Sequence, residues 1–295
     1  MNTQANRLVG LVLAPLLGAC LLAGCGDERS AGDGRTNSQS PQTTQEKRAR
    51  EVADAWPGSA AAAAWSRGYY PMADTTQPPE SGWHSETDER AFESGTIVRS
   101  GKLPTTAITQ GKVAWRSGST LSRPLMEPNT AYQSFAHYSS KGPRLTVTGV
   151  KLGETTITTN RGTATVPAWL FTLDGYDAPL KLVAVTPSKL PEPPIGRAPQ
   201  GSAGGLWSIA RLAGTAADGR SLTVRATHGA CDDGPVVNVL ETDESIVLYA
   251  SVTGARSGPC SAQLIEQNVR VELRQPLADR VVLDALTARP VPYGD

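Results

Sequence analysis

The chain has 295 residues, which is long enough for one or two domains with a hydrophobic core. Its 28 basic and 28 acidic side chains balance, and this argues against a broad nucleic-acid-binding face, which needs excess positive charge. The 29 glycines, the 22 prolines and the low aromatic content of 5% favour short strands and turns over a helical bundle. With four cysteines and three histidines, a large metal cluster is nearly excluded, and we expect no cofactor.

Residues 1–24 have the features of a signal peptide. Arg7 lies in a short polar start, and an apolar run follows from Leu8 to Ala23, interrupted by Pro15. This run of about 16 residues is short for a membrane-spanning helix and typical of the apolar region of a signal peptide. The chain is therefore expected to be exported from the cytoplasm.

The apolar run ends at Leu22-Ala23-Gly24-Cys25, directly before a polar segment. This motif resembles the lipobox of bacterial lipoprotein signals. In that family the cysteine thiol receives a diacylglyceryl group, and cleavage makes the cysteine the first residue of the mature chain. The resemblance implies lipidation at Cys25 and attachment to the outer face of the cell membrane. An ordinary secretory signal is the alternative, and Cys20 is a weaker rival because apolar residues still follow it.

The segment after the lipobox and the segment that follows it differ sharply in composition. Residues 25–43 are rich in Ser, Gly, Asn, Gln and Thr, so they cannot bury a core, and we interpret them as a flexible tether. Strong helix formers follow over 44–66, with Thr44 as a candidate N-cap. A Pro-Gly pair interrupts this range, and Ser59 is placed to cap a second short helix.

Residues 67–95 contain several prolines and are expected to be irregular, and a first β unit follows over 96–186. In this unit Asn160–Gly162 predicts a hairpin turn, and Asn129 is expected to cap a short helix that ends near Tyr138. Apolar and polar residues alternate over several short stretches, which is typical of half-buried strands. The expected strands are 96–100, 107–115, 144–151, 155–159, 163–173 and 180–185.

A proline-rich segment at 187–205 ends in Gly-Ser-Ala-Gly-Gly and is interpreted as a linker. A second β unit is expected over 206–295. Its strands are predicted at 206–213, 220–227, 235–241, 245–253, 262–274 and 280–285. The predicted fold is therefore mainly β, with one or two antiparallel β-sandwich-like units behind a short helical N-terminal region.

Two thiols remain once the lipobox cysteine carries lipid and the signal is removed, namely Cys231 and Cys260. An even pair in an oxidising compartment predicts a disulfide. It would close a loop of about 30 residues and stabilise the fold by roughly 3 to 4 kcal/mol in the chain-entropy model. The other interpretation is a metal site from His228 and Cys231 with Asp232 and Asp233, but zinc needs three or four converging ligands.

Three stretches resemble lipoproteins of actinobacteria that have no assigned activity. They are Asn160–Phe171, Gly229–Pro235 and Pro276–Val282. Ala278 departs from that family, in which glycine often stands at this position. Together with the lipobox, the resemblance implies a cell-envelope location and a similar fold, and it implies no particular activity.

Catalytic motifs are missing from the sequence: there is no Gly-x-Ser-x-Gly, no Ser-x-x-Lys, no His-Glu-x-x-His and no phosphate-binding loop. His84, His137 and His228 are the natural candidates for a general base, and each fits a surface or strand-end position. Acidic residues gather between Asp232 and Glu244, which we interpret as two polar turns rather than a calcium or glycosidase site. No catalytic residue and no metal ligand are assigned.

Three of the six tryptophans, Trp115, Trp169 and Trp207, lie in or beside expected strands, and two, Trp56 and Trp65, lie in the expected helical range. These five are interpreted as packing residues. Nothing in the neighbourhood of Trp83 obviously buries it, so a sugar-binding platform is the alternative to the favoured core packing there. Trp83 and His84 are therefore the candidate ligand-binding residues.

The sequence predicts a membrane-anchored, extracytoplasmic lipoprotein that acts as a non-enzymatic binding or structural module of the cell envelope. The membrane, through the N-terminal lipid, and another envelope protein or a wall polymer are the expected partners, and nucleic acid is not. An extracytoplasmic hydrolase acting on wall glycan or peptide is the alternative.

Overall fold

The computed structural model describes residues 41–137, 142–200, 205–254 and 260–294. The predicted signal peptide, the lipobox cysteine Cys25 and nearly all of the predicted tether lie outside the described residues. The described part is mainly β, with a short helical N-terminal region, as expected. It contains no helix that is both long and apolar enough to cross a membrane.

Two helices open the described chain, α1 (Pro41–Ala55) and α2 (Ala60–Arg67). The first begins earlier than predicted, so Thr44 lies inside it and is not its cap. The second is capped as predicted, because the Ser59 side chain accepts a hydrogen bond from the Ala62 amide at 3.0 Å. The Pro-Gly pair between the helices separates them, as the sequence indicated.

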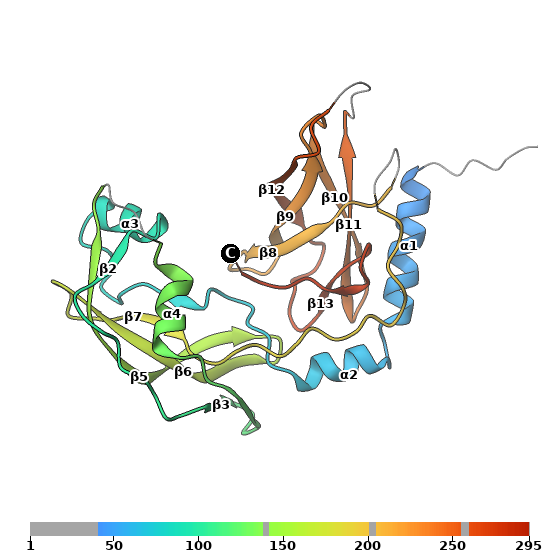
Figure 1. Cartoon of the computed structure of the whole chain (residues 1–295). Coiled ribbons are helices and arrows are strands. Elements are labelled where there is room, and N and C mark those ends of the chain that lie inside the picture. The colour runs from blue at the N-terminus through green and yellow to red at the C-terminus, as the bar shows by residue number, and fades with distance from the viewer. Residues whose placement is uncertain (1–40, 138–141, 201–204, 255–259, 295) are drawn as a thin grey trace, which may run out of the picture. The chain divides into compact units, whose positions relative to one another are not determined.

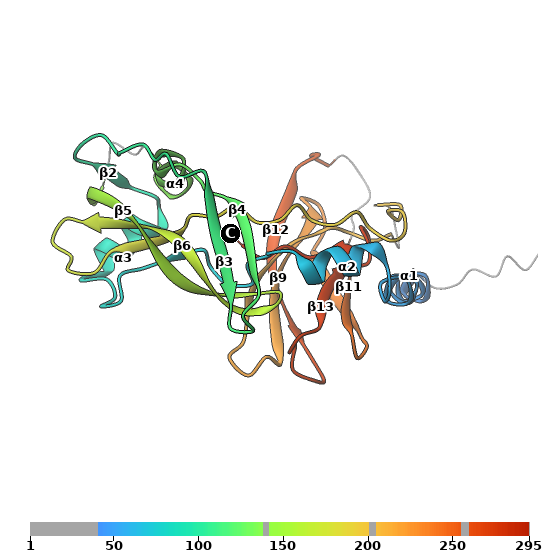
Figure 2. The ribbon, with the colours of Figure 1, turned by 90° about the horizontal axis from the view of Figure 1, so that it is seen from below.

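The first β unit is a seven-stranded sheet centred on β6. Along one edge β6 pairs with β5, and its other edge is shared by β3 and β7. Figure 2 shows β3 and β4 side by side, as their antiparallel register requires. The strands are β1 (Thr76–Gln77), β2 (Ile97–Arg99), β3 (Gln110–Trp115), β4 (Thr120–Pro124), β5 (Leu145–Thr159), β6 (Gly162–Leu173) and β7 (Leu180–Val183).

Two predicted strands are in fact one, because β5 runs unbroken through Gly153. A Cβ at Gly153 would lie 2.5 Å from Cδ1 of Leu170, whose side chain crosses this position from β6. The glycine therefore makes room for a neighbouring side chain and does not mark a turn. The hairpin at its end is as predicted, with Thr159 opposite Gly162. One pairing was not expected, since β2 lies parallel to β5.

Two helices accompany this sheet, α3 (Glu86–Glu93) and α4 (Pro128–Phe135). The segment that holds α3 was expected to be irregular. It is helical because Ser85 caps it and three acidic side chains in its first turn favour the helix N-terminus. The second starts with Pro128, so the predicted cap Asn129 is already inside it. Ala131 and Phe135 of α4 pack with Phe171 of the sheet.

The second β unit has two sheets, ordered β10-β11-β13-β14 and β12-β9-β8. Their facing side chains share one buried cluster, which gives the unit a sandwich-like layering. One neighbouring pair, β11 and β13, is parallel rather than antiparallel. The strands are β8 (Ile209–Thr215), β9 (Ser221–Gly229), β10 (Gly234–Glu241), β11 (Ser245–Thr253), β12 (Leu264–Glu272), β13 (Val281–Asp284) and β14 (Arg289–Pro290).

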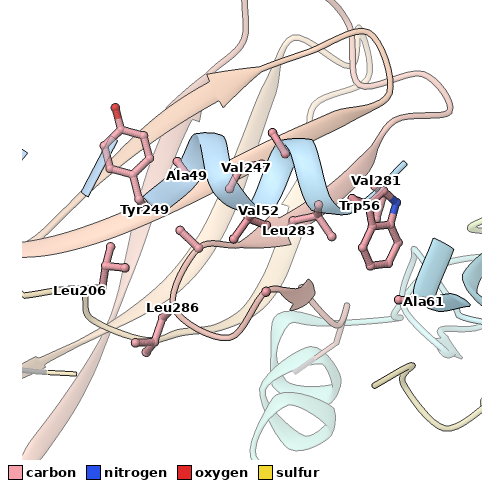
Figure 3. Close-up of a cluster of buried hydrophobic side chains, with 13 residues drawn as sticks. Ala49, Val52, Trp56, Ala61, Leu206, Val247, Tyr249, Val281, Leu283 and Leu286 are labelled. Carbon is pink, nitrogen blue, oxygen red and sulfur yellow. The ribbon is translucent and has the colours of Figure 1, made fainter. Parts of the chain in front are cut away.

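Helix α1 covers the outer face of the four-stranded sheet, so β11 is buried on both sides. Val247 and Tyr249 face the helix, whereas Ile246 and Leu248 face the other sheet. Figure 3 shows Val52 of α1 lying against this layer. A strand that is buried on both faces needs an unbroken apolar run, and this explains the sequence Ile-Val-Leu-Tyr-Ala in β11.

The predicted disulfide is present, and it joins Cys231 to Cys260 with their Cα atoms 6.0 Å apart. Cys231 follows β9, and Cys260 precedes β12, the strand that pairs with β9. The disulfide therefore joins the C-terminal end of β9 to the N-terminal end of β12. It holds the register of the two antiparallel strands at these ends.

Candidate functional site

The two candidate ligand-binding residues lie in the turn before α3, and the fold brings Tyr176 to them from the turn after β6. The imidazole of His84 stacks on the Tyr176 ring, with centroids 3.9 Å apart and planes 7° from parallel. The Tyr176 hydroxyl accepts a hydrogen bond from the His84 amide at 3.0 Å and donates one to the Asp88 carboxylate at 2.9 Å. We call Trp83, His84, Asp88, Phe92 and Tyr176 the His84 cluster.

Within this cluster Trp83 is a packing residue, which is the interpretation that the sequence favoured over a sugar-binding platform. Its ring lies 4.9 Å from Phe92 and meets Tyr176 edge-on at 6.0 Å. It is half-buried against the core of the first β unit. Trp83 therefore holds α3 against the sheet, and the exposed aromatic surface belongs to His84.

Burial chiefly raises the pKa of Tyr176, and the hydrogen bond to Asp88 adds to the increase, although the bond from the His84 amide opposes it. The hydroxyl consequently stays protonated at neutral pH and keeps donating to Asp88. Glu86 and Glu89 stand beside Asp88 in the first turn of α3. The cluster thus presents a flat, exposed imidazole held rigidly next to carboxylates. Such a surface can stack on a ring and accept hydrogen bonds from its hydroxyl groups.

The other two histidines lie elsewhere. His137 follows α4 and is exposed. His228 is buried at the end of β9, where its Nδ1 lies 2.9 Å from the Gly229 carbonyl oxygen. Within the described ranges no histidine is hydrogen-bonded to a carboxylate. The hydrolase alternative therefore remains a prediction from the sequence alone.

The metal interpretation of this region is wrong, because the sulfur of Cys231 is bonded to Cys260. Asp232 is also engaged, since its Oδ2 accepts a hydrogen bond from the Gly229 amide at 2.7 Å. In the part of the chain that the structure describes, no group of three His, Cys, Asp or Glu side chains is arranged to hold a metal ion. These residues build the turn that the disulfide closes.

The acidic residues between Asp232 and Glu244 do not form a paired carboxylate site around Glu241. The Glu241 carboxylate accepts hydrogen bonds from the backbone amides of Arg274 and Gln275, at 2.8 and 3.3 Å. It therefore fixes the turn that follows β12. Sequence reasoning placed this residue in a polar turn and did not find its partners, which lie more than thirty positions away.

Sequence reasoning also missed Tyr176 and Asp88. The two residues are 88 positions apart, and only the packing of α3 beside the sheet joins them. The one available signal was the Ser85 cap with acidic residues behind it, which predicts a helix and places Asp88 in its first turn.

Comparisons with known proteins give no further guide. No family model, no curated protein and no solved structure matches this chain.

Proposed function

We propose that this protein is a bacterial lipoprotein, anchored through Cys25 to the outer face of the cytoplasmic membrane, and that it acts as a non-enzymatic binding module of the cell envelope. The observation that carries the proposal is the sequence Leu22-Ala23-Gly24-Cys25 at the end of a short apolar run. The resemblance to actinobacterial lipoproteins supports it. The disulfide between Cys231 and Cys260 also supports it, because such bonds persist in oxidising compartments.

The anchor works by burying acyl chains. Each buried CH₂ contributes roughly 0.8 kcal/mol, so one chain binds marginally and the two chains of a diacylglyceryl group hold firmly. The thiol of Cys25 would attack a membrane glycerophospholipid and displace its phosphorylated headgroup, so that a thioether bond to diacylglycerol forms and the thiol proton is lost. Hydrolysis of the peptide bond between Gly24 and Cys25 by water would then release the signal peptide. The described domain would then stand at the membrane surface on the predicted tether.

We assign the binding face to the His84 cluster and its ligand to a wall glycan. Sugar rings have an apolar face that stacks on aromatic rings and hydroxyl groups that hydrogen-bond to carboxylates. The exposed His84 imidazole and the acidic first turn of α3 supply both kinds of contact. Because the Tyr176 hydroxyl fixes the ring beneath the imidazole, little ordering is needed on binding.

The anchor is tested by the intact mass of the full-length chain extracted from membranes of a bacterial host. We expect the mass of a chain that starts at Cys25 and carries diacylglycerol. Cys25→Ser should abolish the added mass and the membrane attachment. Cys20→Ser is the matched control and should leave both unchanged. An unlipidated wild-type chain, or lipid lost in the Cys20 variant instead, would overturn the anchor.

The binding face is tested by sedimenting the protein with purified cell-wall glycan. His84→Ala should release the protein into the supernatant. His137→Ala removes an exposed histidine outside the cluster and should sediment like wild type. If the two variants behave alike, the His84 cluster is not the glycan-binding face, whatever the result for the anchor.

A further inference from the structure

Strand β12 is the outer strand of its sheet, and among the described residues it pairs only with β9. Its first five residues are all exposed. An edge of this kind presents unpaired backbone N–H and C=O groups, which can accept another strand. Most edge strands in natural proteins are short or covered, whereas β12 offers nine residues.

Exposed apolar residues occur on β12 and on the strand beside it. Four large apolar residues are exposed in the described chain, and three of them lie here: Leu264 (61%) and Ile265 (37%) on β12, and Val236 (40%) on β10. The two strands are neighbours, since a Cβ at Gly234 of β10 would lie 3.1 Å from Oε1 of Gln267. β10 is also the outer strand of its sheet. Exposed apolar residues on two neighbouring outer strands favour an interaction at this edge.

The sequence of β12 indicates which partner fits. If two copies of the strand pair antiparallel about a two-fold axis, all nine residues overlap only when the axis passes through the central residue, Asn268. That register places Glu266 of each copy opposite Arg270 of the other. Two opposite-charge pairs form by symmetry, and each would stabilise the pairing. Moving the axis by one residue to Val269 would instead place Glu266 opposite Glu272.

The charged side chains are accessible for these contacts. Arg270 and Glu272 are 69% and 68% exposed, so their own ion pair is weak and can be exchanged. Glu266 lies beside Arg211 and Arg225 on the same face, and it is still 39% exposed. On the other face the same register sets Ile265 against Val271 of the second copy, which covers part of the exposed apolar surface.

We propose that two copies of this protein associate through β12, antiparallel and in the register centred on Asn268, to form one continuous six-stranded sheet. The contact is isologous, as in most homodimers, because each copy uses the same strand. The backbone groups of the free edge gain partners, and the two charge pairs select the register. This association does not depend on the proposed lipid anchor or on the glycan-binding face.

The test is a cysteine at the centre of the strand. In antiparallel pairs the Cα atoms of opposed residues lie about 4.5 to 5.5 Å apart, which is within the range that a disulfide can bridge. Full-length Asn268→Cys, exported by a bacterial host, should run mostly as a dimer on a non-reducing gel and as a monomer after reduction. Glu266→Cys and Arg270→Cys should link to each other when the two variants are co-expressed.

Arg270→Cys alone is the matched control. Its two copies would be separated by four positions along the strand, roughly 14 Å, and should not link. The proposal is overturned if Asn268→Cys stays monomeric, which would mean that the charges on β12 protect the edge instead. It is also overturned if the control links to the same extent. If the cysteine variants fail to fold, the mass of the extracted wild-type protein is measured by sedimentation. The mass of a dimer supports the proposal, and the mass of a monomer refutes it.

Discussion

Arg280 donates a hydrogen bond from Nη1 to the Glu241 carboxylate at 2.9 Å, and the two side chains are only 7% and 5% exposed. The Nη2 of Arg280 also donates to the carbonyl oxygens of Gln275 and Pro276. Burial acts to raise the pKa of Glu241, but hydrogen bonds from Arg274, Arg280 and Gln275 outweigh it, so this pKa lies below its usual value. The pair fastens the segment between β12 and β13 to the end of β10.

Breaking this pair should cost more than breaking an exposed one. Arg280→Ala removes the closest and most buried ion-pair partner of Glu241 and leaves only the exposed Arg274 guanidinium and two backbone amides beside it, so we expect a loss of about 2 to 3 kcal/mol in the free energy of unfolding. Arg90→Ala removes an exposed pair with Glu86 and should cost less than about 1 kcal/mol. Urea denaturation of both variants measures the difference. Equal losses would show that Glu241 can reach water.

The contribution of Asp284 to the free energy of unfolding should fall as the pH rises from 4 to 6. Burial raises the pKa of Asp284 to about 6, against the bonds from Thr287 and Leu286 that would lower it. Since the folded state holds the proton more tightly than the unfolded state, this group stabilises the fold at low pH. That contribution is lost as the carboxyl ionises, and the shift corresponds to about 3 kcal/mol.

The measurement is the free energy of unfolding of wild type and Asp284→Asn at pH 4 and pH 7. The variant cannot ionise, so the difference between the two proteins should change by about 2 to 2.5 kcal/mol between these pH values, because the unfolded carboxyl is already partly ionised at pH 4. Other groups, including Glu241, titrate alike in both proteins and cancel. A constant difference would mean that Asp284 ionises as readily in the folded state as in the unfolded one.

Gly153 should not tolerate a methyl group. Gly153→Ala places Cβ against Leu170 Cδ1, and the repacking should lower the free energy of unfolding by about 1 to 3 kcal/mol. Gly214→Ala is the control, because a Cβ at this glycine of β8 meets nothing within 4 Å. Thermal unfolding compares the two variants. Adding Leu170→Ala to the Gly153 variant should remove the clash and restore part of the lost stability. If no stability is restored, the loss comes from the backbone conformation at residue 153 and not from the contact with Leu170.

Substitutions of Trp83 and His84 should affect α3 differently, because Trp83 packs against the helix and His84 is exposed. Trp83→Ala removes contacts with Phe92 and Tyr176, so α3 should open more often and its amide hydrogens should exchange faster. His84→Ala removes an exposed ring and should leave exchange in α3 close to that of wild type. Faster exchange in both variants would show that the stack on Tyr176 also holds the helix in place.

Local patterns predicted much of the fold. The hairpin at 160–162, the Ser59 cap and most strands of the second β unit depend on neighbouring residues, and the structure has them. The disulfide followed from counting cysteines. Features set by distant partners were missed. The strands predicted at 144–151 and 155–159 form one strand, because the Leu170 side chain that Gly153 accommodates cannot be recognised in the local sequence.

At the candidate site, too, local features could be predicted and features set by distant residues could not. Trp83 and His84 could be selected as unusual residues, but their roles depend on Tyr176, which is more than ninety positions away. The contacts with this ring and with Phe92 make Trp83 a packing residue. The parallel pairings of β2 with β5 and of β11 with β13 were likewise outside local reasoning, because alternation does not reveal strand direction.

Helix α1 is both the first described element after the predicted tether and the cover of a buried core (Figure 1). A pull on the N-terminal end of the described chain would therefore load this helix before any strand. Its detachment would uncover Val247, Tyr249 and Leu283 while the core between the two sheets stayed closed. Mechanical tension would thus detach α1 first. It would expose a previously buried apolar surface without unfolding the two packed sheets.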